Sequence, residues 1–153
     1  MSAHANTLTP ARPGSALSPW TVRGALTLDA LVTGGNGLAY LAFAGPLGDL
    51  LGIGRGTLLD LGLLLTGYAL AVGALAARRQ PSRLGVRAVI DVNLGWVVLS
   101  LTAMELWLRP TTAGFVWIPL QAAAVALFAV LQFTALRRSE RGERSDRVGP
   151  DTP

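Results

Sequence analysis

The chain has 153 residues, of which 51% are hydrophobic and only 14% are charged, and its mean hydropathy is +0.46. Soluble domains carry about 25% charged residues, so this composition argues against a water-soluble globule and indicates a membrane protein. The chain contains no cysteine, which excludes disulfides, thiolate nucleophiles and iron–sulfur clusters. The only histidine, His4, lies in a polar leader, so we expect no histidine metal site inside the protein.

The basic residues give the chain a formal net charge of +4, and all 13 of them are arginines. A basic chain can bind nucleic acid, but these arginines flank apolar segments, and a membrane explains that placement better. We therefore expect the lipid bilayer, and no nucleic acid, as the partner of the charged residues.

The chain begins with a polar stretch over residues 1–22, which contains three prolines and predicts a flexible leader. Four apolar segments follow, at about 25–44, 57–77, 88–108 and 115–136. Each is close to the ~20 residues that a helix needs to cross ~30 Å of hydrocarbon. Residues 139–153 form a mixed-charge tail, for which composition predicts disorder. The sequence thus predicts an all-α membrane protein with a four-helix transmembrane bundle over residues 23–138.

Helix breakers separate these segments. They are Gly45-Pro46, Gln80-Pro81-Ser82 and Arg109-Pro110-Thr111-Thr112. One alternative concerns Ala42-Phe43-Ala44, a small-residue pattern that could end a cleaved signal peptide. The preceding apolar run is long and carries Asp29 and Asn36, which argues against that reading.

The arginines also predict how the bundle is oriented. The leader, the middle loop and the tail hold all of them except Arg55 and Arg109, which lie in the other two loops. Positive charge stays on the cytoplasmic side, so both termini should be cytoplasmic in a multi-pass protein of the cell membrane. Trp107, Phe115 and Trp117 would form an aromatic belt at the opposite interface.

Polar residues inside the apolar segments are the best functional leads, because such groups are costly in hydrocarbon and face the bundle interior. The first segment carries them at positions i, i+4, i+7 and i+11, so they share one helix face. With two residues of the third segment, they form a candidate intramembrane polar cluster: Asp29, Thr33, Asn36, Tyr40, Asp91 and Asn93.

Two interpretations of this cluster stay open. Hydrogen bonding between helices is the favoured one for Asn36, Asn93, Gln121 and Gln132, because polar residues at helix interfaces commonly serve packing. The acidic residues lie near predicted helix ends, and Asp91 is one turn from Arg87, which suggests an ion pair. The sharper interpretation is a pocket or polar pathway near the midplane, where acidic groups can bind protons or cationic substrates.

The stretch Leu31–Ala39, LVTGGNGLA, resembles the glycine-rich phosphate loop of dinucleotide-binding domains. That fingerprint requires a strand–turn–helix unit, and here Tyr40 replaces its final glycine and three more apolar spans follow. The chain also lacks lysine, which the dehydrogenase pattern uses for catalysis. We therefore expect no nucleotide and no other cofactor.

The small residues in the helices instead predict close packing. Three glycines around Asn36 would make a thin surface on the first helix, and a small-residue ridge lies on the second. The predicted packing residues are Gly34, Gly35, Gly37, Ala69, Gly73 and Ala77. No catalytic constellation is recognisable, so we expect a protein that is not an enzyme.

Three segments resemble a known group: RGALTLDALVTGGNGLAYLAFAGPL, RPTTAGFVWIPLQ and the closing LRR. On these residues the chain resembles the small four-helix integral membrane proteins that are abundant in actinobacterial genomes. The resemblance covers residues from about 22 to 138 and implies a fold and a lineage, but no activity. In gross layout alone, the chain is also similar to the DoxX-type four-helix proteins.

Two functions follow as hypotheses. The first is a non-enzymatic helix-packing scaffold or accessory subunit that associates with a second copy or with another membrane protein. The alternative is a small oligomeric transporter or channel that uses the intramembrane polar stripes. A pocket lined by Asn36, Asp91 and Asn93 would favour the alternative, whereas a dry and fully packed centre would favour the scaffold.

Overall fold

The computed structural model describes residues 21–106 and 108–147, and the described chain is all-helical, without strands. It forms five helices: α1 (Val22–Ala42), α2 (Ala44–Leu51), α3 (Arg55–Ala77), α4 (Arg83–Leu106) and α5 (Thr112–Arg147). Within this part, α3, α4 and α5 are long and apolar enough to cross a membrane. The helix α1 is not among them, because Asp29, Asn36 and its glycines lower its mean hydropathy.

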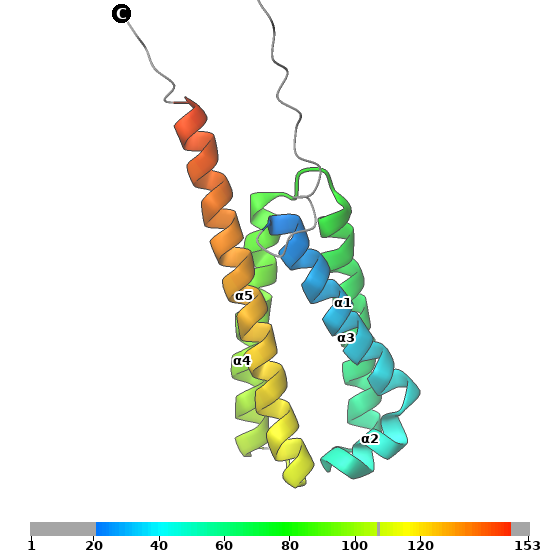
Figure 1. Cartoon of the computed structure of the whole chain (residues 1–153). Coiled ribbons are helices and arrows are strands. Elements are labelled where there is room, and N and C mark those ends of the chain that lie inside the picture. Colours follow the sequence, from blue (N-terminus) through cyan, green and yellow to red (C-terminus); the bar gives the residue numbers. More distant parts are fainter. Residues whose placement is uncertain (1–20, 107, 148–153) are drawn as a thin grey trace, which may run out of the picture.

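The four long helices are arranged as two pairs, α1 with α3 and α4 with α5 (Figure 1). The pairs are joined mainly where α1 packs against α5, whereas α3 and α4 meet over a much smaller contact. The start of α1, the α3–α4 loop and the end of α5 lie at one end of the bundle. The short helix α2 lies at the other end (Figure 1).

The α1–α3 pair is close because two glycines face each other. A Cβ on Gly37 would lie 2.7 Å from Thr66 Oγ1 and 3.0 Å from the Gly62 carbonyl oxygen. A Cβ on Gly62 would in turn lie 2.9 Å from the Gly37 carbonyl oxygen. No side chain larger than hydrogen fits at either position without moving a backbone, so these glycines set the spacing of the pair.

The helix α2 is the element that sequence reasoning missed. Gly45-Pro46 was interpreted as a helix breaker, but Pro46 lies in the first turn of α2. Proline is tolerated there, because the first backbone N–H groups of a helix have no partner within the helix. The dipeptide thus ends α1 and starts a second helix, and the predicted segment 25–44 is divided at Phe43, the C-cap of α1.

The end of α2 is fastened to the start of α5. Gly52, the C-cap of α2, has a φ of 70°, a conformation that glycine adopts without the Cβ penalty. A Cβ on it would lie 2.7 Å from the Thr111 backbone nitrogen. The Thr111 N–H donates to the Leu51 carbonyl oxygen at 3.1 Å, and its hydroxyl donates to the Leu50 carbonyl oxygen.

The helix α5 extends further than predicted. It continues to Arg147, whereas composition predicted a disordered tail from Ser139. The segment has no proline before Pro150, and arginine and glutamate are good helix formers. An ion pair between Arg87 Nη2 and Glu140 Oε1, at 3.2 Å, also joins this part of α5 to α4. Residues 1–20 and 148–153, which include most of the leader, lie outside the described residues, as does Trp107.

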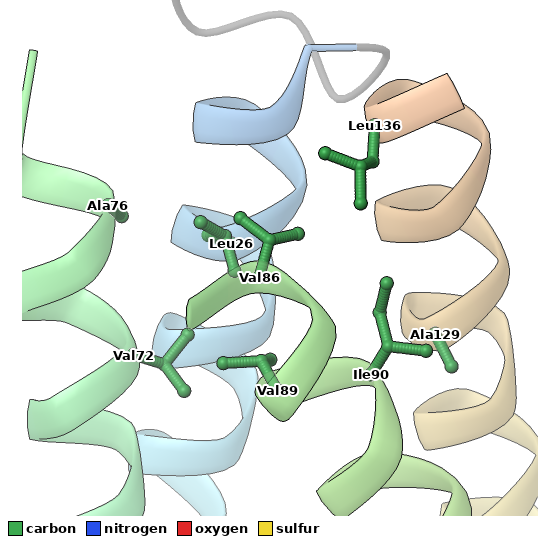
Figure 2. Packing of buried hydrophobic residues seen from close by; sticks show 8 residues of the cluster. All are labelled: Leu26, Val72, Ala76, Val86, Val89, Ile90, Ala129 and Leu136. Atoms are coloured by element: carbon green, nitrogen blue, oxygen red, sulfur yellow. The ribbon is translucent and has the colours of Figure 1, made fainter. Parts of the chain in front are cut away.

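Two apolar clusters lie toward the two ends of the bundle. The first lies toward the α3–α4 loop and draws on all four long helices (Figure 2): Leu26, Val72, Ala76, Val86, Val89, Ile90, Ala129 and Leu136. The second lies around α2 and consists of Tyr40, Ala44, Leu51, Ile53, Leu58 and Leu65. The candidate site lies between these clusters.

Candidate functional site

Asp29 on α1 is the centre of a buried hydrogen-bond network, and its side chain is fully buried. It accepts hydrogen bonds from Thr33 Oγ1 at 2.9 Å, from Asn93 Nδ2 at 2.8 Å and from Gln132 Nε2 at 2.7 Å. The Tyr68 hydroxyl donates to Asn93 Oδ1 at 2.8 Å. One carboxylate thus joins side chains of α1, α4 and α5 directly, and Asn93 extends the network to α3.

A second network lies further along α1, toward α2. Asn36 and Gln121 exchange two hydrogen bonds through their amides, at 2.9 and 3.1 Å. Gln121 Nε2 and Trp117 Nε1 both donate to the Tyr40 hydroxyl, each at 3.0 Å. The two networks are distinct along α5, because eleven residues, or about 16 Å of helix, separate Gln121 from Gln132.

A cavity of about 270 Å³ lies between the two networks. Thr33, Tyr68 and Asn93 of the first network and Asn36, Trp117 and Gln121 of the second form its polar border. The rest of its wall is apolar and comes from all four long helices: Val32, Leu64, Leu65, Val92, Trp96, Leu120, Ala124, Val125 and Phe128.

The cavity has thin walls toward the sides of the bundle. Leu64 on α3 and Val92 on α4 line it and are also 57% and 51% exposed on the outer surface. Val32 on α1 and Leu120 on α5 do the same at the opposite seam. At these seams between helices, a single side chain thus reaches from the cavity to the outer surface.

The predicted polar cluster is divided between these two networks. Asp29, Thr33 and Asn93 meet in the first, and Asn36 and Tyr40 belong to the second. Asp91 is in neither: its side chain is exposed and lies in a groove between α4 and α5. The expected ion pair of Asp91 with Arg87 is not what the structure describes, because Arg87 pairs with Glu140 instead. Asp29, which lies near the start of the first apolar segment, is fully buried.

The predicted packing residues also have different surroundings. Gly34 faces Ala69, and a Cβ added to Gly34 would lie 3.2 Å from the Ala69 Cβ. A Cβ added to Gly37 would have still closer neighbours on α3. Gly73 faces Ala30 at ordinary contact distance. Gly35 has no neighbour within 4 Å, and Ala77 is exposed, so neither makes a close helix contact.

Two important members of the site were not in the predicted cluster. Tyr68 was overlooked, although it is a lone hydroxyl-bearing aromatic residue in an apolar helix and could have been noticed on that ground. Gln132 was assigned to helix packing, and it does join helices, but it does so through the buried carboxylate of Asp29. Within the described residues, no three His, Cys, Asp or Glu side chains gather where they could hold a metal.

Comparisons of this chain with protein-family models, with curated proteins and with solved structures find no match. The geometry of the two networks and the cavity is therefore the basis for any statement about function.

Proposed function

We propose that the chain is an integral membrane protein with four spans, in which α1 is the fourth. Its 21 residues give a length of about 31 Å, enough for the hydrocarbon core. Four of its polar residues belong to the two networks: Asp29, Thr33, Asn36 and Tyr40. On its outer face, Leu28, Leu31, Val32 and Leu38 are exposed. An apolar exterior around a polar interior is the distribution expected of a helix whose surroundings are lipid.

The orientation of this bundle is part of the same proposal, with both termini in the cytoplasm. Among the described arginines, those near the α3–α4 loop and the end of α5 outnumber those at the α2 end, where Arg55 and Arg109 lie. Retention of positive charge on the cytoplasmic side supports this orientation.

Cysteine labelling tests both the fourth span and the orientation, because the natural chain has no cysteine. We expect a membrane-impermeant maleimide to label Asp49→Cys in intact cells. The variants Ser15→Cys, in the leader, and Gln80→Cys, in the α3–α4 loop, should react only after permeabilisation. Labelling of Ser15→Cys and Asp49→Cys from the same side would show that α1 does not span the membrane.

For the biochemical role, we propose that the bundle binds a small, largely apolar molecule that it takes from the bilayer. The carrying observation is the cavity, which has apolar walls and two polar borders, as in typical small-molecule sites. The polar groups at its wall are amides, hydroxyls and an indole, which orient a ligand by hydrogen bonds, so the proposal is one of binding and not of catalysis. Passage of the ligand across the membrane, as in a small transporter, would extend this role.

A scaffold or accessory subunit is the second proposal. The observation that favours it is the glycine contact between α1 and α3, which is a device for helix association. A scaffold does not need a cavity, however, and an unfilled interior costs stability. The ligand-binding role therefore explains more of the molecule.

A cavity-filling variant tests the binding proposal. Ala124 lines the cavity, whereas its neighbour Ala123 is exposed and does not. With neopentylbenzene as the probe, we expect saturable shifts of the Trp96 and Trp117 indole N–H resonances in the purified full-length protein. Ala124→Leu should abolish the saturable shifts, and Ala123→Leu should retain them. Shifts that rise linearly with the probe, or that are the same in both variants, would contradict a binding cavity.

A further inference from the structure

The cavity has a buried carboxyl group, that of Asp29, directly behind its wall. This carboxyl is hydrogen-bonded to Thr33, Asn93 and Gln132, and in its ionised form it would accept from all three. The three donors are a hydroxyl and two amides, which are all neutral. They satisfy the carboxyl oxygens, and none of them would cancel the charge of an ionised Asp29.

The Asp29 carboxyl group is close to any molecule in the cavity. Thr33 and Asn93 line the cavity and donate directly to Asp29, so a single layer of side chains separates the carboxylate from the bound molecule. An apolar interior screens charge far less than water does, so the carboxylate acts strongly over such a distance. A buried charge at membrane depth is costly unless it is paired. A cation in the cavity would offset this cost.

The aromatic residues of the wall favour the same kind of ligand. Four aromatic side chains from three helices border the cavity: Tyr68 on α3, Trp96 on α4, and Trp117 and Phe128 on α5. Aromatic faces attract organic cations, tryptophan most strongly, and the attraction grows when water is excluded. The other polar residues of the wall, Thr33, Asn36, Asn93 and Gln121, are neutral and hydrogen-bonded to other side chains. A small hydrated metal ion would therefore lose its water without gaining charged oxygen ligands.

We infer that the cavity binds a small lipophilic organic cation, an amine or quaternary ammonium compound with an apolar body. The inference rests on the proposed function, since it names the ligand class of the same cavity. It combines three features: the buried Asp29 carboxyl group, the aromatic wall and an apolar volume large enough for an organic group.

A matched pair of probes tests the charge separately from the shape. Benzyltrimethylammonium and neopentylbenzene differ only in having a cationic nitrogen or a neutral carbon at the branch point. With the indole resonances of Trp96 and Trp117 as the readout, we expect the wild-type protein to bind the cation at least tenfold more tightly, with its membrane partitioning measured and corrected in empty micelles. Equal or tighter binding of neopentylbenzene would overturn the cation inference and leave the binding cavity standing.

Variants of the carboxylate locate the source of the preference. Asp29→Asn should abolish the preference for the cation while neopentylbenzene still binds, and Asp91→Asn, at an exposed carboxylate, should leave the preference unchanged. A preference that persists in a folded Asp29→Asn variant would overturn the role of Asp29. If that variant does not fold, the wild-type probe pair still decides the inference. If neither probe gives a saturable shift in wild-type protein, the proposed function fails as well.

Discussion

Replacing Gly37 with alanine is expected to lower the free energy of unfolding by about 2 kcal/mol, because the added Cβ overpacks the α1–α3 contact. The new atom would lie 2.7 Å from Thr66 Oγ1, 2.9 Å from the Thr66 backbone nitrogen and 3.0 Å from the Gly62 carbonyl oxygen. Two of these three atoms belong to the backbone of α3, so a rotamer change cannot relieve the contact and the helices must move apart.

The control is Gly35→Ala, two residues away on the same helix. A Cβ there has no neighbour within 4 Å, so the variant should be neutral or more stable by up to about 1 kcal/mol through helix propensity. Unfolding in mixed micelles with increasing dodecyl sulfate, followed by circular dichroism, measures both variants. Equal stabilities of the two would show that α1 and α3 are not packed as described.

The second large effect is expected for Asp29→Ala, which should cost about 3 kcal/mol in the free energy of unfolding. The substitution removes the shared acceptor of Thr33, Asn93 and Gln132. Each buried donor that loses its partner costs about 1–3 kcal/mol. The sum is reduced because Asn93 Nδ2 also donates to Gln132 Oε1, at 3.3 Å, and keeps that bond.

Asp91→Ala provides the contrast, since Asp91 is an acidic residue that is exposed on α4. Its removal should change stability by less than about 0.5 kcal/mol. The same unfolding measurement compares the two variants. A cost for Asp91→Ala as large as that for Asp29→Ala would contradict the different placement of the two carboxylates.

Helix periodicity was sufficient to find one side of the site. The polar positions of α1 recur at i, i+4, i+7 and i+11, and this stripe is indeed directed at the bundle interior. The same arithmetic shows why Asp91 could not join Asn93. Residues that are two positions apart in a helix point in directions about 200° apart around its axis. When Asn93 faces the interior, Asp91 must therefore face outward.

The remaining features depend on tertiary contacts that no local pattern encodes. The bond from Gln132 to Asp29 joins residues 103 positions apart, and which of several polar stripes meet is decided by how the helix pairs dock. The sequence around Gly62 does not mark it as a packing residue. Its importance follows only from the close approach of Gly37 on the facing helix. A proline such as Pro46 can either end a helix or lie in the first turn of a new one, and the local sequence is compatible with both.

The thin side walls of the cavity have a consequence for how the proposed ligand would be supplied. Because several side chains that line the cavity are also exposed on the outer surface, a ligand of a membrane-embedded bundle would enter from the lipid. Occupancy would then follow the mole fraction of the compound dissolved in the bilayer and not its concentration in water. A compound scarce in the cytoplasm but concentrated by partitioning could fill the cavity, and the membrane itself would act as the reservoir that sets the response.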